Sequence, residues 1–346
     1  MVAEIVTARF TDERVELAHG AGGKASRRLV EGLLLPYLSN AILDELGDAA
    51  HLEVHGAKLA FTADSFVVKP LAFPGGSIGE LAVNGTVNDL AVSGAKPLAL
   101  VMTLILEAGL STSIVEREIA AMAEAARRAG VLIVGGDTKV VEHGKADGLY
   151  ITTAGIGLTD ARLHLAPSNV HVGDKVLLSG PVGDHGITVL LARGEIDLEA
   201  DLRSDTRSVW PLVSALIDAA ASSVRWMRDP TRGGAATALN ELARAAKVAI
   251  VLDEESVPVR PAVRGACEIL GLDPLHIACE GQFVAIVAPE RADAALEALR
   301  RAPGGEEAAL IGEIQEAPAG LVIARSAYGG SRVVDMLVGD PLPRIC

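Results

Sequence analysis

The spacing of apolar residues changes several times along the first half of the chain. In three segments, apolar residues recur three and four positions apart, which predicts helices over 23–37, 78–93 and 111–129. Short apolar runs between turn residues predict strands over 58–62, 97–106, 131–134 and 149–157. The helix over 111–129 has the clearest limits, because Ser111 precedes it, Arg127 and Arg128 lie in its last turn and Gly130 follows it.

The second half repeats this alternation of strands and helices. A stretch rich in Pro, Ser, Asn and Gly over 166–174 separates the halves and is the expected domain boundary. Two successive blocks of this kind predict an α/β (or α+β) architecture with two sheets. The elements predicted in the second block cover 175–179, 185–193, 208–221, 233–247, 248–252, 261–270, 282–288, 291–301 and 321–324.

We therefore expect an N-terminal domain over 1–165, a C-terminal α+β domain over 166–328 and a mobile tail over 329–346. The glycines and prolines of the tail leave no room for a final helix, and its last eight residues predict an extended strand ending in Cys346. At about 3.3 Å per extended residue, the segment from Gly339 onward reaches about 20 Å. That reach is enough to move a group attached to the terminal thiol between a binding site and a partner.

Composition narrows the class of protein. Half of the 346 residues are hydrophobic and 22% are charged, so a large core is available and intrinsic disorder is excluded. The net charge of −14 argues against non-specific binding to nucleic acids or anionic membranes. Only 3% of the residues are aromatic, too few for the stacking platforms that bind single-stranded nucleic acid.

Targeting segments are not predicted. The apolar run over 98–106 stops at Glu107 and is far shorter than the about 20 residues of a membrane-spanning helix. The first 14 residues alternate apolar with charged positions and lack the apolar stretch of a signal peptide. Three cysteines far apart do not form a disulfide framework, so we expect a reducing cytoplasm.

Aspartates recur where predicted strands run out into glycine-containing turns. A single aspartate there is an ordinary turn residue, but several at strand ends suit Mg²⁺, which binds carboxylates together with substrate phosphates. Asp89 lies instead in a predicted helix, beside Asn88. The candidate metal ligands are Asp64, Asp89, Asp137, Asp184 and Asp229.

Two glycine-rich segments are candidates for phosphate contacts. Gly233 and Gly234 start a predicted helix just after Thr231 and Arg232, which suits an anion held by free backbone N–H groups and a guanidinium. The segment 19–24 (His-Gly-Ala-Gly-Gly-Lys) fails the P-loop pattern at Ala18 and Ala25. It is either a glycine-rich flap over phosphates or the start of a helix, and the sequence does not decide between them.

Acidic, basic and thiol side chains elsewhere in the sequence are further candidates for chemistry. Glu280, between apolar segments, is either a structurally paired carboxylate or a base with a raised pKa, and Lys139 is either a phosphate contact or a surface residue. His185 is predicted to be a hydrogen-bonding loop residue rather than a catalyst. Cys267 and Cys279 fit small buried positions, whereas the terminal Cys346 cannot be a core cysteine.

Taken together, these residues resemble the ATP-binding superfamily of aminoimidazole ribonucleotide synthetase, selenophosphate synthetase and thiamine-monophosphate kinase. Within it, the segment 19–23 and the terminal Pro-Arg-Ile-Cys are similar to the HypE family of hydrogenase maturation factors, and the resemblance extends from about residue 17 to the end. The segments that carry the superfamily resemblance are Asp64, 84–89, 135–138 (Gly-Gly-Asp-Thr), 183–186 (Gly-Asp-His-Gly) and 229–234 (Asp-Pro-Thr-Arg-Gly-Gly).

The resemblance implies a carbamoyl dehydratase that makes the cyanide ligands of [NiFe]-hydrogenase. A carbamoyltransferase would load Cys346, ATP with Mg²⁺ would dehydrate the carbamoyl group to a thiocyanate, and an iron-carrying scaffold complex would accept the cyanide. It implies a homodimer whose N-terminal sheets pair, and catalysis by Cys346 with Glu280 as base and Lys139 as charge stabiliser or alternative base. The implied ATP-site residues are Asp64, Asn88, Asp89, Gly136, Asp137, Thr138, Asp184, Asp229, Thr231, Arg232, Gly233 and Gly234.

Other readings remain open at this stage. Selenophosphate synthetase would want a cysteine or selenocysteine in the glycine loop, where this chain has Ala21. Aminoimidazole ribonucleotide synthetase and thiamine-monophosphate kinase leave a terminal thiol unexplained. A non-catalytic, ATP-gated carrier would not need so many carboxylates at strand ends.

Overall fold

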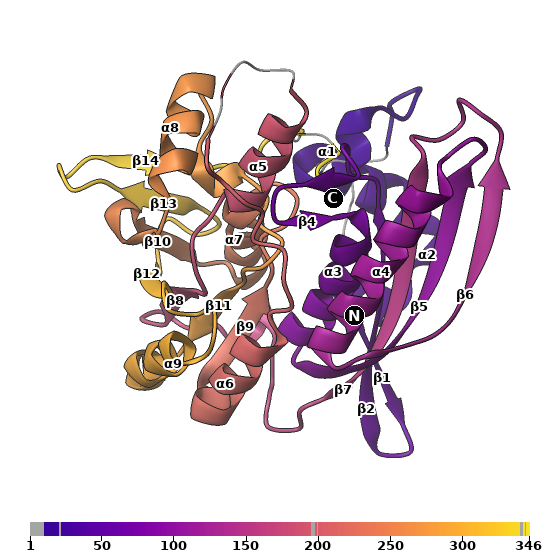
Figure 1. The fold of residues 1–346 in the computed structure, drawn as a ribbon. Coiled ribbons are helices and arrows are strands. Elements are labelled where there is room, and N and C mark those ends of the chain that lie inside the picture. Colours follow the sequence, from indigo (N-terminus) through magenta and orange to yellow (C-terminus); the bar gives the residue numbers. More distant parts are fainter. Residues whose placement is uncertain (1–9, 21, 195–197, 199, 340–341, 343) are drawn as a thin grey trace.

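Two sheets and the helices around them form the two halves of the molecule (Figure 1). The structure, a computed structural model, describes residues 10–20, 22–194, 198, 200–339, 342 and 344–346. Ala21, Pro341, Pro343 and the first nine residues, to which part of the sequence predictions refers, lie outside these ranges. Within the described ranges, no helix is long and apolar enough to cross a bilayer.

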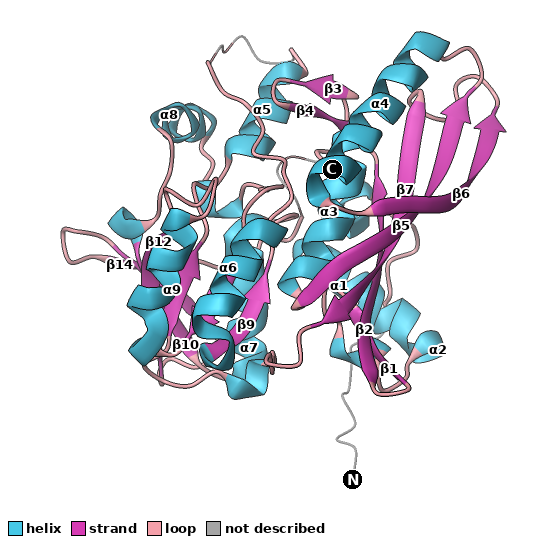
Figure 2. Ribbon diagram, turned by 60° about the horizontal axis from the view of Figure 1, so that its bottom comes forward, coloured by secondary structure: helices cyan, strands magenta, loops and turns pink. Residues whose placement is uncertain are grey.

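The N-terminal sheet has helices on one face. Its strand order is β1-β2-β7-β5-β6, and β5 pairs with β6 in parallel and with β7 antiparallel. Helices α3 (Ile78–Val92) and α4 (Thr112–Ala129) pack against it, as both ribbon views show (Figures 1 and 2). The strands are β1 (Ala50–Val54), β2 (Ala57–Phe66), β5 (Ala95–Glu107), β6 (Leu132–Val141) and β7 (Leu149–Thr159).

The other face of this sheet, here called the open face, presents apolar side chains to solvent. Phe61 on β2, Val101 on β5 and Leu158 on β7 each expose more than two fifths of their surface. Leu132 and Val134 on the edge strand β6 are about two thirds exposed. An apolar surface of this kind on a folded domain is typical of an interaction site.

The C-terminal sheet is covered on both faces. The side chains of β8 (Lys175–Leu178) alternate between two helical layers. Val176 and Leu178 pack with helix α7 (Gly234–Ala246) on one face. Leu177 packs under α6 (Trp210–Ala220) and α9 (Pro289–Arg301) on the other face. The strand order is β14-β13-β10-β12-β8-β11-β9. The remaining strands are β9 (Val224–Arg228), β10 (Ala249–Asp253), β11 (Val284–Val287), β12 (Ala309–Gln315), β13 (Val322–Arg325) and β14 (Ser331–Val333).

The two halves share one hydrophobic core. Phe66 and Leu81 of the first half pack in the same cluster as Ile187 on α5 (Asp184–Ala192) and Val263 on α8 (Pro261–Leu270). The side chain of Asn88 on α3 adds polar links across this junction. Its amide donates to the carbonyls of Arg207 and Glu280 at 3.0 and 3.1 Å and accepts from the Val209 N–H at 2.8 Å.

Most predicted elements are confirmed within a few residues, but two aspartates are placed differently from the prediction. Asp64 and Asp137 lie inside the long strands β2 and β6 rather than in turns after short ones. Hydrogen bonds to neighbouring strands extend both strands through polar residues. The pattern of apolar residues in the sequence does not assign these polar residues to a sheet. The strands β1, β9, β12 and β14 and the small hairpin of β3 (Ala72–Phe73) and β4 (Gly76–Ser77) were also missed.

The helix predicted over 23–37 is confirmed as a continuous helical segment. It consists of α1 (Gly23–Leu29), a wider π-helical turn over Val30–Leu34 and α2 (Leu35–Leu38). Gly85, in the middle of α3, has a packing reason, because a Cβ there would come within 2.7 Å of the Phe66 ring.

Candidate active site

A group of carboxylates gathers where the two halves meet; we call it the junction cluster. Asp64 and Thr62 lie two residues apart on β2 and therefore on the same, helix-facing side of the sheet. There the Thr62 hydroxyl donates to the Asp89 carboxylate of α3 at 2.9 Å. Asp229 follows β9, and Glu280 precedes β11. The members are Asp48, Asp64, Asp89, Asp229 and Glu280.

Burial and mutual repulsion disfavour the charged forms of this cluster. Burial and then the charge of Asp48 raise the pKa of Asp229 to about 8, with Asp64 adding to the rise and Arg228 opposing it. Burial followed by the charges of Asp229, Asp48 and Asp64 places the pKa of Asp89 well above its usual value. Carboxylates arranged in this way attract a cation, because a positive ion relieves both effects.

Glu280 is the most deeply placed carboxylate of the cluster. Its side chain is 2% exposed, and its Oε1 is buried without a hydrogen-bond partner among the described residues. Burial, then the charges of Asp229 and Asp64, holds its pKa well above the ordinary range. Its backbone is fixed on two sides, since the N–H donates to Asp205 at 3.0 Å and the carbonyl accepts from Asn88. A fixed carboxyl with a raised pKa is the form that a general base takes near neutral pH.

Arg232 supplies a positive charge at the edge of the cluster. The charges of Cys346, Asp64 and Glu280 act to raise its pKa, with that of Cys346 contributing most. Gly233 and Gly234 follow with positive φ angles of 77° and 63°, and α7 starts at Gly234. A Cβ on Gly234 would meet the Leu275 carbonyl oxygen at 2.4 Å, so only glycine allows this close turn.

The glycine-rich segment, predicted as either a flap over phosphates or the start of a helix, leads into a helix and lies against Arg232. Gly23 begins α1, which confirms the helix start. The preceding turn lies against Arg232, which donates from Nη1 to the Gly20 carbonyl at 2.9 Å. A Cβ on Gly22 would come within 2.9 Å of the Arg232 Cβ. The segment therefore borders the candidate phosphate site without being shown to act as a flap.

The C-terminus lies at the same place. The Val67 N–H, just after β2, donates to the Cys346 carbonyl at 3.1 Å, and the Lys69 N–H donates to the Arg344 carbonyl at 3.2 Å. Leu342 and Ile345 are 3% and 1% exposed and belong to the core shared by the two halves. Cys346 forms no disulfide and is half-buried. In this structure the end of the tail is docked, and it brings the terminal residue beside Arg232.

Four predicted site residues on β6 do not reach the junction cluster. Across the sheet, Asp137 is in register with Thr103 and, through it, with Thr152 on β7. Asp64 is in register with the next residue on β7, Thr153. Neighbouring residues of one strand face opposite sides of the sheet, so Asp137 and Asp64 are on opposite faces. Asp137 and Lys139 therefore lie on the open face, three strands or about 14 Å from Asp64 at the usual strand spacing. They form an exposed ion pair of 2.5 Å, and Thr138 donates its N–H to Asp137. A Cβ on Gly136 would overlap the Met102 carbonyl, so this glycine permits close strand packing.

The side chains of two other predicted site residues are already engaged in contacts within the protein. Asp184, on the first turn of α5, forms a 2.8 Å ion pair with Arg260, although its Oδ1 is buried without a hydrogen-bond partner among the described residues. The amide of Asn88 is used by the three backbone hydrogen bonds that join the halves. Asn88 is thus placed to hold the Glu280 backbone.

Sequence reasoning missed three residues that shape this site. Asp48 belongs to the cluster and is held by Arg228 at 2.8 Å, and Asp205 binds the Glu280 backbone. His185 was predicted in a loop, but it lies in the first turn of α5 and is fully buried. A hydrophobic pattern gives no signal for any of them, since each is defined by a contact with a distant part of the chain. Cys267 and Cys279 are buried, as predicted.

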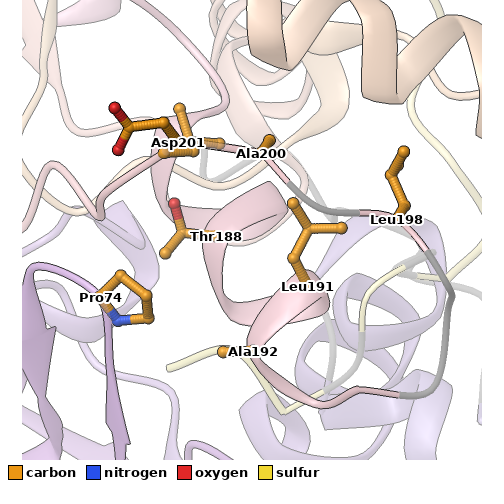
Figure 3. A pocket seen from close by; sticks show the side chains of 8 residues that line it. Pro74, Thr188, Leu191, Ala192, Leu198, Ala200 and Asp201 are labelled. Carbon is orange, nitrogen blue, oxygen red and sulfur yellow. The ribbon is translucent and has the colours of Figure 1, made fainter.

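Cavities elsewhere do not compete with this site. Figure 3 shows a cavity of about 500 Å³ beside α5, lined by Pro74, Thr188, Leu191, Leu198 and Asp201 among others. None of the junction carboxylates lines it. In the part of the chain that the structure describes, no three His, Cys, Asp or Glu side chains lie close enough to hold a metal ion by themselves.

Comparison with known proteins identifies the family. The family models of AIR synthase related proteins match residues 46–159 (N-terminal domain) and 171–324 (C-terminal domain). A carbamoyl dehydratase HypE from Azotobacter vinelandii is 48% identical over 332 residues, covering 96% of this chain and 97% of that protein. The chain belongs to the HypE family.

Solved HypE structures have the same fold. A hydrogenase maturation protein HypE in complex with ATP superposes with a TM-score of 0.80 at 45% identity, covering 96% of this chain and 100% of the other. HypE from a HypE–HypF complex gives a TM-score of 0.85 at 41% identity, with 89% and 99% covered. The resemblance inferred from the sequence and the predicted two-sheet α/β fold are therefore confirmed.

Proposed function

We propose that this chain is an ATP-dependent carbamoyl dehydratase that converts an S-carbamoyl group on Cys346 into a thiocyanate. The observation that carries this proposal is the docked C-terminus, which brings the only residue of the tail with a thiol beside Arg232 and the junction cluster. The HypE relatives named as carbamoyl dehydratases and the ATP complex of a HypE protein support it.

The overall reaction requires one phosphoryl transfer and two proton removals. The carbamoyl oxygen attacks the γ-phosphorus, ADP leaves, and the nitrogen loses one proton to give an S-linked imidate phosphate. Loss of the second N–H proton, with cleavage of the C–O bond, forms the C≡N triple bond and releases phosphate. Phosphorylation is needed because an amide oxygen is otherwise a poor leaving group.

The residues of the site have separate tasks in this scheme. Glu280 takes the nitrogen proton, since it is fixed, buried and has a raised pKa. Arg232, with Thr231, Gly233 and Gly234, binds phosphate oxygens through its guanidinium and the N–H groups that begin α7.

A divalent cation fits the junction cluster. Asp64, Asp89 and Asp229 do not lie close enough to hold the ion by themselves, but they would contribute oxygens to it together with the phosphate groups of ATP, as is usual for Mg²⁺. The raised pKa values of Asp89 and Asp229 support this role, because they arise from burial and from repulsion among the acids, both of which a bound cation relieves. The ion would neutralise phosphate charge when bound.

Two protein partners follow from the chemistry. A carbamoyltransferase must load the thiol, and HypF, found bound to a HypE protein in a solved complex, is the candidate. An iron-carrying scaffold complex must accept the cyanide. A reducing cytoplasm is the compartment in which the Cys346 thiol remains available.

We also propose a homodimer through the open face of the N-terminal sheet. Its exposed apolar side chains need a cover. Thr138 points to the helix-facing side, but its neighbours Asp137 and Lys139 lie on the open face and cannot reach the cluster of their own chain. In the dimer they would serve the ATP of the partner subunit, with Lys139 stabilising charge.

The deciding experiment is the intact mass of the C-terminal peptide. After incubation with the carbamoyltransferase system, Cys346 should carry a carbamoyl adduct that loses one water only when Mg-ATP is hydrolysed. An adduct that persists with Mg-ATP would mean that the chain is a carrier and that dehydration takes place elsewhere. A Cys346→Ala chain that still gives a dehydrated protein adduct would contradict the role of the thiol.

A further inference from the structure

One buried side chain contacts the tail next to its reactive end. His185 is fully buried, and its Nε2 lies 2.7 Å from the Ile345 carbonyl oxygen, one residue before Cys346. Its Nδ1 lies 2.8 Å from the Ser204 hydroxyl. The histidine is on α5 of the C-terminal half and is 160 positions away from Ile345 in sequence. The bond is therefore a tertiary link made only when the tail is docked.

The direction of these hydrogen bonds follows from their partners. A carbonyl oxygen can only accept, so Nε2 must carry the proton and Nδ1 must accept from the Ser204 hydroxyl. The Ser204 oxygen in turn accepts the Thr206 N–H at 3.1 Å. The Phe73 ring packs edge-on against the imidazole, with centroids 5.5 Å apart. Ser204 and Phe73 thus fix the tautomer and the orientation in which the ring can hold the tail.

Backbone hydrogen bonds from Val67 and Lys69 also hold the Cys346 and Arg344 carbonyls, and two side-chain contacts lie further out. Arg193 donates to the Arg344 carbonyl at 2.9 Å, and the Arg344 side chain pairs with Asp147. Both side chains of that ion pair are about one third exposed. Water can replace exposed contacts of this kind at little cost, whereas a buried carbonyl that loses its donor has no such replacement.

We propose that His185 is a positioning residue that holds the tail at the junction through the Ile345 carbonyl, so that the group on Cys346 stays aligned during the ATP-dependent step. This inference rests on the proposed function for its catalytic consequence, but the docking itself can be measured without any chemistry. The bond must break whenever the tail leaves to meet a partner. His185 therefore favours dehydration and opposes exchange of the tail.

Docking is tested by trypsin cleavage after Arg344 in the full chain, without ATP or partner. Cleavage releases the dipeptide Ile345-Cys346, which intact mass detects. His185→Leu fills the space without a donor and should speed release about tenfold, since one buried hydrogen bond is lost. His185→Gln, whose amide can still donate, should stay near the wild-type rate. His276→Leu is the matched control, because His276 makes a similar 2.8 Å bond to the Asp335 carbonyl, away from the terminus.

The catalytic consequence is tested with the two steps separated. In His185→Leu, dehydration of the carbamoylated chain should slow about tenfold while loading by the carbamoyltransferase is not slowed. Equal trypsin rates in His185→Leu and wild type would overturn the inference. Faster trypsin release together with no carbamoyl adduct on wild-type Cys346 would instead refute the proposed function and leave the docking role intact.

A measurement on the wild-type chain covers the case in which His185→Leu does not fold. The ¹⁵N shifts of the His185 ring report which nitrogen carries the proton. The Nε2–H form is expected. An Nδ1–H form would exclude donation to Ile345 and overturn the inference.

Discussion

The junction cluster and the Asp137–Lys139 pair contain the same kind of residue in opposite electrostatic states. At the junction, Asp229 is buried among other acids and its pKa is raised to about 8. On β6, hydrogen bonds from Lys139 and from the Thr138 N–H lower the pKa of the exposed Asp137. At the first site the acids outnumber the neighbouring Arg228 and Arg232 and attract a cation, whereas the second site carries its own positive charge. A carboxylate is thus identified as a metal ligand by its surroundings rather than by its place after a strand.

The largest effect is expected from Glu280→Gln. The amide keeps the shape of the side chain but cannot accept a proton, so dehydration should fall by about a thousandfold, within the usual range for loss of a general base. ATP should still bind. Single-turnover conversion of the carbamoylated chain, followed by mass, measures the loss.

The pH dependence of the wild-type reaction sharpens this prediction. A base must be deprotonated, and the pKa of Glu280 is raised by burial, so the rate should increase with pH across a range above that of an ordinary glutamate. A rate that is flat with pH, or a Glu280→Gln chain within tenfold of wild type, would assign the proton to another group.

A smaller effect is expected on stability from Asp229→Asn. The pKa of Asp229 is raised to about 8 in the folded chain, against an ordinary value of 3.8. The folded chain therefore binds the extra proton, and stability is fully present below about pH 4 and is lost as the pH rises through 8. Without ATP or metal, the asparagine variant should avoid this loss and be more stable at pH 8.5 by a few kcal/mol.

Urea unfolding at pH 5 and pH 8.5 measures this difference. Asp137→Asn is the matched control, because that aspartate is exposed and should change stability by less than about 0.5 kcal/mol. Mg-ATP should stabilise the wild-type chain but not Asp229→Asn. Equal pH dependence of the wild type and Asp229→Asn would show that this carboxyl is not protonated in the folded chain.

The smallest effect tests whether the two regions cooperate across subunits. Asp229→Asn and Asp137→Asn homodimers should each turn over ATP slowly. Mixing them produces heterodimers in which one of the two sites has both aspartates intact. With random exchange, activity should return to about a quarter of wild type, since half of the dimers carry one complete site of two. No recovery would place Asp137 outside the partner's site.

Much of the fold was predictable because it depends on local pattern. The limits of α3, α4 and α8 follow from periodicity and from glycines such as Gly130 and Gly271, both in the left-handed conformation. The strands β9 and β12 were missed because Arg225 and Arg228 interrupt the apolar residues of one and Gly312 those of the other, and only pairing with β11 and β8, respectively, defines them as strands.

The site was predictable only in part, because contacts between distant parts of the chain decide which residues meet there. Residue type and local sequence pointed to Asp64, Asp89, Asp229, Glu280 and Cys346. Register decided which of the predicted residues share a face, and Asp137 therefore separated from Asp64. Asp48, Asp205 and His185 act through contacts with residues far away in the chain, which no local pattern encodes.

The three hydrogen bonds of Asn88 have a consequence for how this molecule can move. One amide, 2% exposed, ties α3 to the segment around Arg207 and to the Glu280 backbone. Hinge opening between the halves would break all three bonds and expose the shared core. Substrate traffic therefore does not require a clamshell motion of the domains. We expect the halves to act as a fixed frame and the last few residues of the chain to be the part that moves.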